Sequence, residues 1–182
     1  MSEHRRAAKS LSRLRGLSVV TMLLLTGCGT GEADSPMPTV AVSAPVSPPP
    51  ESQTEAIKRS YIAFVAILDR ADSLPASTRR QKLGVHMTDP QLTQVLDRVE
   101  EMKRTDIATY GTVATHIQSV RIVGTGATLR DCQDSSGAGL LNVRTGKKIN
   151  RGVEEETIKA YLAEGSDGRW RVTKSISYGK GC

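Results

Sequence analysis

Aromatic residues and histidine are scarce in this sequence of 182 residues. It contains one Trp, four Tyr and one Phe, so any hydrophobic core must be mainly aliphatic. Of its three histidines, His86 and His116 alone follow the first 27 residues. They lie far apart, without partners at ligand spacing, and the sequence therefore predicts no zinc site. We also find no G-x-S-x-G or phosphate-binding loop, and we expect no cofactor.

Long hydrophobic runs are missing as well. The apolar stretch at residues 17–25 has nine residues, whereas a transmembrane helix needs about 20. Five basic residues precede this stretch and a small-residue site follows it, which is typical of a signal peptide spanning residues 1–27. The alternative is a buried N-terminal helix, which would explain neither the basic flank nor the small-residue site.

The sequence has no basic run outside this segment. Residues 1–27 hold five of the 25 basic residues and one of the 19 acidic residues, which leaves 20 against 18 and a net charge of +2. A charge this small gives no electrostatic basis for binding nucleic acid, and we exclude that class of function.

The signal segment ends in a motif that predicts lipidation. Leu25-Thr26-Gly27-Cys28 matches the bacterial lipobox, in which the cysteine is lipidated and becomes the new N-terminus. A diacyl or triacyl anchor, palmitate included, supplies the two or more chains that stable membrane attachment requires. We therefore expect a lipoprotein on the extracytoplasmic face of the cell membrane. Arg5-Arg6 leaves open whether export is general secretory or twin-arginine.

Residues 28–50 have the composition of a tether. Six prolines lie among Ser, Thr, Ala and Val, and such a segment favours extended, unpacked backbone. Fully extended, it would reach on the order of 80 Å from the bilayer. Residues 51–182 then have the length of one domain.

Helices are expected first in this domain. Ser52 and Glu55 form a capping-box pattern, and apolar residues at helical spacing follow until Leu74-Pro75. A short helix is expected at 79–83. A third helix should begin at Thr88-Asp89-Pro90.

Strands are expected after residue 105. Residues 113–123 are rich in β-branched side chains, and their phase shifts between Ile117 and Val120, which suggests a bulge. Turn signals at 124–126 and 166–168 separate further strands at 127–133, 140–143, 157–163 and 170–178. Helices followed by hairpin-linked strands predict an α+β domain whose antiparallel sheet is covered on one face by helices.

Two cysteines remain once Cys28 is lipidated. In an oxidising compartment Cys132 and Cys182 should pair, and the loop of about 50 residues would stabilise the fold by roughly 4 kcal/mol. The alternative is a redox pair, but C-x-x-C spacing is missing.

Several segments of the predicted domain resemble a known group of proteins. The segments 129–135, 140–147 and 168–172, with the terminal Gly181-Cys182, resemble a group of secreted actinobacterial lipoproteins of unassigned role. That group is similar to the nuclear transport factor two-like superfamily, whose cone-shaped α+β fold is shared with ketosteroid isomerase. Members of the group usually have an aromatic residue just before the strand that begins with two leucines, and this sequence has Gly139 at that position.

The resemblance implies a pocket between the curved sheet and the first helix, although the fold hosts enzymes and binding modules alike. Tyr61, Phe64, Trp170 and Tyr178 are the expected lining residues. The candidate acids and bases are Tyr61, Asp69, His86, Tyr110, His116 and Asp131.

Each candidate also has a structural interpretation. We expect Tyr61 in the core with its hydroxyl at a rim, Asp69 in solvent, and Asp131 in a turn-rich segment beside the disulfide. Asp131 and Asp134 lack the calcium-loop pattern. A non-catalytic module that binds a small apolar ligand or an envelope protein is therefore favoured over an isomerase or dehydratase. The sequence does not determine the oligomeric state.

Overall fold

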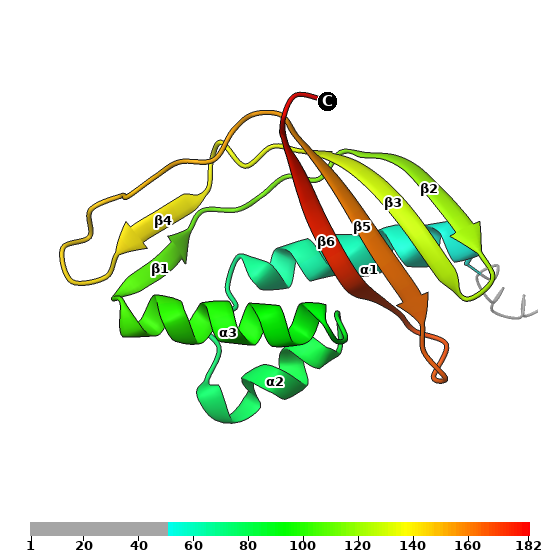
Figure 1. Ribbon diagram of the computed structural model, residues 1–182, viewed down its shortest axis with the longest axis horizontal. Coiled ribbons are helices and arrows are strands. Elements are labelled where there is room, and N and C mark those ends of the chain that lie inside the picture. Colours follow the sequence, from blue (N-terminus) through cyan, green and yellow to red (C-terminus); the bar gives the residue numbers. More distant parts are fainter. Residues whose placement is uncertain (1–50) are drawn as a thin grey trace, which may run out of the picture. The chain divides into compact units, whose positions relative to one another are not determined.

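A computed structural model describes residues 51–182 of the chain. The predicted signal peptide, Cys28 and the tether lie outside these residues. Helices come first and strands follow, as expected (Figure 1). The elements are α1 (Gln53–Leu68), α2 (Ala76–Gly84), α3 (Gln91–Arg104), β1 (Ile107–Tyr110), β2 (Ile117–Val123), β3 (Gly126–Gln133), β4 (Gly139–Asn142), β5 (Glu156–Glu164) and β6 (Trp170–Lys180).

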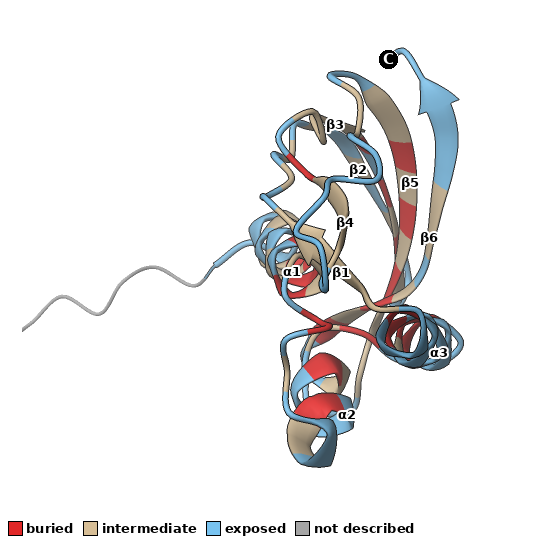
Figure 2. Ribbon diagram, turned by 90° about the vertical axis from the view of Figure 1, so that its left-hand side faces the viewer, coloured by how far each residue is buried: buried red, intermediate tan, exposed pale blue. Residues whose placement is uncertain are grey.

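The strands form two antiparallel sheets. Four of them pair in the order β2-β3-β5-β6, and β1 pairs separately with β4. The helices lie on one side of the larger, curved sheet and leave its other face without a helix (Figures 1 and 2). The predicted α+β class, with helices covering one face of an antiparallel sheet, is confirmed.

Helix α1 begins as the sequence predicts but ends earlier. The Ser52 hydroxyl accepts a hydrogen bond from the Glu55 amide at 3.3 Å, which caps the first turn. The helix stops at Leu68, because the following turn is held by β1: the Thr109 hydroxyl donates to the Asp69 carbonyl oxygen at 3.0 Å. This contact spans 40 residues, so the sequence near Pro75 could not reveal it.

The hydrophobic core lies between α1, α3 and the larger sheet. It is mainly aliphatic, and its aromatic members are Tyr61, Phe64 and Trp170. All buried apolar side chains of the described domain come from residues 57–172, so this segment contains a complete core of its own and is expected to fold independently. Within residues 51–182, no helix is long and apolar enough to cross a bilayer.

The predicted bulge and turns are confirmed. The register of β2 against β3 shifts between Ile117 and Ser119. Gly124 and Gly168, in the two hairpin turns, have φ values of 58° and 71°, a conformation that favours glycine. Strand β1 was not predicted, because its four residues show no alternation of burial and it is defined by its pairing with β4.

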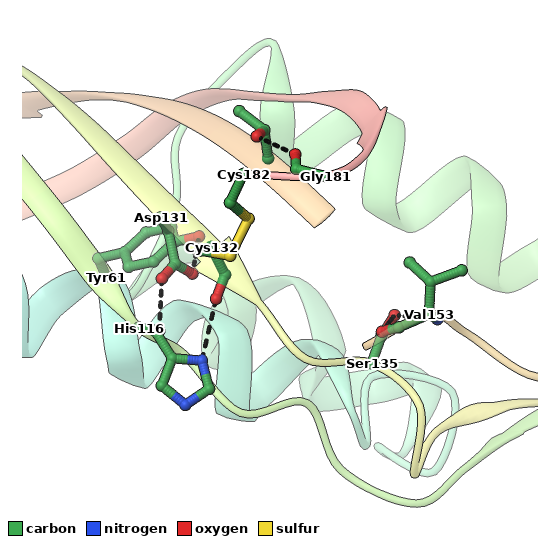
Figure 3. Close-up of a disulfide and its surroundings, with 9 residues drawn as sticks. Tyr61, His116, Asp131, Cys132, Ser135, Val153, Gly181 and Cys182 are labelled. Atoms are coloured by element: carbon green, nitrogen blue, oxygen red, sulfur yellow. Dashed lines mark hydrogen bonds between the residues drawn. A yellow bond between two sulfur atoms is a disulfide. The ribbon is translucent and has the colours of Figure 1, made fainter. Parts of the chain in front are cut away.

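The disulfide joins the end of the chain to β3. Cys132 and Cys182 are bonded with their Cα atoms 5.8 Å apart, the pair that the sequence indicates (Figure 3). The Thr157 hydroxyl also donates to the Gly181 carbonyl oxygen at 2.6 Å. These contacts attach the segment after β6 to the middle of the sheet.

Candidate functional site

A cavity of about 650 Å³ lies between α3, the β1-β4 sheet and the ends of α1 and β3. Its size is typical of small-molecule sites. The wall that α3 provides is partly apolar, with Val95, Val99 and Met102, and β4 adds Leu140. The polar part of the lining is Asp69, Asp72, Gln91, Gln94, Arg98, Thr109, Gln133, Ser135, Asn150, Arg151 and Glu156.

Asp69 stands at the cavity wall, where α1 ends. One of its carboxylate oxygens accepts the amide N–H of Val113 at 3.2 Å. Burial raises the pKa of this carboxyl, and the hydrogen bond from Val113 opposes that rise. Asp69 was expected in solvent, and it is instead partly buried, because α1 ends there and its C-terminus packs beside residues 109–113.

Asp72 has a positioning role in the same wall. Its carboxylate is buried and accepts the amide N–H of Thr109 at 3.0 Å. It also lies 2.9 Å from the Thr109 hydroxyl, whose single proton it shares with the Asp69 carbonyl oxygen. Two hydrogen bonds thus tie β1 to the turn after α1. They fix the distance between the α1 end of the cavity and the β1-β4 sheet.

A hydrogen-bonded chain runs from the cavity into the core. The side-chain amide of Gln133, which lines the cavity, donates to the Tyr61 hydroxyl at 2.8 Å. That hydroxyl donates to Asp131 Oδ2 at 3.0 Å, and the His116 amide N–H donates to Asp131 Oδ1 at 2.6 Å (Figure 3). Both oxygens of the buried carboxylate therefore have partners.

The environment of Tyr61 keeps its hydroxyl protonated. Burial raises the tyrosine pKa well above its ordinary value, and the negative charge of Asp131 raises it further. Tyr61 thus remains a hydrogen-bond donor to Asp131 at all physiological pH values. From the sequence, this hydroxyl was expected at a rim of the pocket, but the whole side chain is buried.

Asp131 is 1% exposed and lies inside β3 rather than in a turn-rich segment. Strand alternation explains this position, because Leu129 and Asp131 face the core while Arg130 and Cys132 face outward. Asp131 does not line the cavity, and Gln133 is the member of the chain that does. Sequence reasoning missed Gln133, although the same alternation places it inward.

The four residues expected to line the pocket do not line the cavity. Tyr61, Phe64 and Trp170 fill the core between α1 and the sheet, with exposures of 0%, 1% and 5%. Tyr178 is 61% exposed and lies on the opposite face of the sheet. The aromatic side chains occupy the space beside α1, which moves the cavity toward α3 and β1.

Tyr110 provides the aromatic lining instead. Its hydroxyl donates to the Asn150 carbonyl oxygen at 2.9 Å. A Cβ atom on Gly139 would lie 2.8 Å from this hydroxyl and 2.4 Å from the Asn150 oxygen. Glycine is therefore required at position 139, because Tyr110 and residue 150 occupy the adjacent space.

Neither histidine lines the cavity. The pKa of His86 is lowered by burial and, to a smaller extent, by the positive charge of Arg70. The His116 side chain is exposed, and its Nδ1 lies 3.0 Å from the Cys132 carbonyl oxygen. Within residues 51–182, no group of three or more His, Cys, Asp or Glu residues is placed to hold a metal ion.

Comparison with solved structures supports the fold. The intermembrane space region of the chloroplast protein ARC6 superposes with a TM-score of 0.57 and 16% identity, covering 72% of this chain and 100% of that one. A nuclear transport factor 2-like superfamily protein from Salmonella enterica serovar Typhimurium superposes with a TM-score of 0.48 and 9% identity, covering 72% of this chain and 95% of that one. For a ketosteroid isomerase-like protein from Erwinia carotovora the TM-score is 0.44 and the identity 16%, with 68% of this chain and 92% of that one covered.

The likeness to the ARC6 region, at this identity, concerns the fold alone. No protein-family model and no curated protein matches the sequence. Structures described as nuclear transport factor 2-like or ketosteroid isomerase-like are among the neighbours. Since a fold by itself does not determine function, function has to be argued from the cavity.

Proposed function

We propose that the domain is a non-catalytic binding module that takes a small, mainly apolar ligand with one polar end. The cavity carries this proposal, because its lining combines apolar side chains of α3 and β4 with polar groups that include the Gln133 amide. Apolar surface supplies most of the affinity in such sites, and a few polar groups fix the orientation of the ligand. Gln133 is well placed for this, since its bond to Tyr61 holds its side chain in position.

Filling the cavity with a larger side chain should weaken the binding of an apolar ligand. We expect Leu140→Trp to weaken binding of the apolar dye Nile red at least tenfold, because Leu140 lines the cavity and indole is much larger than isobutyl. Leu141→Trp is the matched control, since Leu141 follows on the same strand but does not line the cavity. Fluorescence titration measures both. Equal affinities for the two variants would contradict the proposal.

We also propose that the module is a lipoprotein, anchored through Cys28 to the extracytoplasmic face of the cell membrane. The lipobox and the proline-rich segment after it support this proposal. Cys28→Ala should leave the protein unprocessed or release it from the membrane fraction, as measured by fractionation and intact mass. Membrane retention in processed form would contradict lipidation at this residue.

One observation favours a second function. Asp69 faces the cavity with a raised pKa, as a general base that removes a proton next to a carbonyl group would. An isomerase of this kind would exchange α-protons of a bound cyclic ketone with deuterated water. Loss of that exchange in Asp69→Asn, with Nile red binding retained, would favour the enzyme over the binding module.

A further inference from the structure

The outer face of the four-stranded sheet is free of helices (Figures 1 and 2). Cross-strand pairing places the side chains of this face in rows, because directly paired residues point to the same side. One row is Arg121, Thr128, Tyr161 and Lys174, and the next is Ser119, Arg130, Lys159 and Ile176. We call these two rows the basic face.

The basic face has four cations and no acidic residue. Within the described domain, none of the four makes an ion pair, in contrast to Arg79 and Arg171, which pair with Glu100 and Asp167. Arg121, Arg130 and Lys174 are exposed, and Lys159 is half-buried. These charges therefore remain available to a partner outside the domain.

Aromatic residues accompany the cations. Lys159 Nζ lies 5.1 Å from the centre of the Tyr161 ring, and Tyr178 borders a hollow together with Arg130 and Lys159. Tyrosine suits a boundary between water and apolar material, since its ring is apolar and its hydroxyl is polar. The combination of basic and tyrosine side chains fits the headgroup region of a bilayer.

The extent of the basic face indicates the kind of partner. Four strands about 4.8 Å apart span roughly 14 Å, so the four cations extend across the sheet, beyond the hollow that Arg130 and Lys159 border. Pairing with a second copy through this face would bring like charges together, which is unfavourable. A broad anionic surface is complementary to it.

We propose that the basic face binds the surface of a membrane containing anionic phospholipids, so that the domain lies against the bilayer. This inference rests on the proposed lipid anchor, which holds the domain within reach of the membrane. Each Lys or Arg close to an anionic surface contributes about 1 kcal/mol, or about fivefold in affinity. The four cations together are therefore sufficient for measurable binding.

The test uses residues 51–182, which contain a complete core and lack the proposed anchor. Binding is measured by flotation with vesicles of phosphatidylcholine alone or with 30% phosphatidylglycerol. We expect binding to the anionic vesicles only. Raising the salt concentration to about 0.5 M should remove it, because screening shortens the range of the attraction.

Two variants with the same change in net charge test the location. Lys159→Gln combined with Lys174→Gln should weaken vesicle binding by about 25-fold, since two cations are lost from the basic face. Lys82→Gln combined with Lys103→Gln should have little effect, because these exposed residues lie on α2 and α3. Circular dichroism establishes that both variants are folded.

Three outcomes would overturn the proposal: equal loss of binding in the two variants, no binding to anionic vesicles, or displacement by inorganic phosphate at constant ionic strength. The last outcome would indicate a site for a free anion. Leu140→Trp should bind vesicles normally, because Leu140 lines the cavity and is not part of the basic face. Failure of the cavity proposal can therefore be told apart from failure of the membrane-binding proposal. Failure of lipidation at Cys28 would likewise leave this measurement unchanged.

Discussion

Loss of the Cys132–Cys182 disulfide is expected to lower the free energy of unfolding by about 4 kcal/mol. The bond closes a loop with a sequence separation of 50 residues, and the chain-entropy model gives this value for a loop of that length. It also holds the segment after β6 against β3, and without it the neighbouring hydrogen bond from Thr157 of β5 to Gly181 would be lost more easily as the chain end frays. The double variant Cys132→Ser/Cys182→Ser is compared with the oxidised domain by urea denaturation.

The same variant supplies the control for reduction. A thiol reductant should destabilise the unsubstituted domain to the level of the double variant, and it should leave the double variant unchanged. A loss below about 1 kcal/mol would show that the loop is already restricted in the unfolded chain. Nile red binding should persist in folded protein, since neither cysteine lines the cavity.

Replacing Asp131 with alanine is expected to cost at least about 3 kcal/mol of stability. The substitution removes the acceptor of two hydrogen bonds and leaves the Tyr61 hydroxyl proton and the His116 amide without partners. Hydrogen bonds to a charged group contribute about 1.5–3 kcal/mol each, and unsatisfied buried donors add a penalty. The free energy of unfolding from urea denaturation measures the loss.

Asp134→Ala is the matched control. Asp134 is not buried and accepts one hydrogen bond, from the Ser136 amide at 2.8 Å, so its loss should cost less than about 1 kcal/mol. A double-mutant cycle that combines Asp131→Ala with Tyr61→Phe isolates the interaction between these two side chains. We expect a coupling free energy of about 1–3 kcal/mol for the pair. Additive effects in the cycle would contradict the hydrogen-bonded chain as the source of stability.

Local sequence patterns predicted most of the elements, although α1 ends earlier than expected and β1 was not predicted. The Ser52 cap, the bulge near Ile117 and the hairpin glycines were predictable because each depends on residues close together in the chain. The α+β class followed from the order of these elements. The cysteine pair followed from the small number of cysteines.

The cavity could not be predicted in the same way. Its lining combines residues from α1, α3, β1, β3, β4 and the loop before β5, so its position depends on packing over long sequence distances. The core positions of Tyr61, Phe64 and Trp170 were foreseeable from their apolar character, yet their distance from the cavity was not. The end of α1, and with it the place of Asp69, was decided by the contact with Thr109.

The sequence by itself determined that helices precede strands, that the core is aliphatic and that two cysteines pair, because each follows from local pattern or composition. Only the tertiary structure decided where charge and polarity gather. Arg121, Arg130, Lys159 and Lys174 are separated in a chain without a basic run, and strand pairing brings them onto one face. Asp131 and Gln133 likewise acquire their partners through the packing of α1 against β3, which brings Tyr61 to them from 70 and 72 residues away.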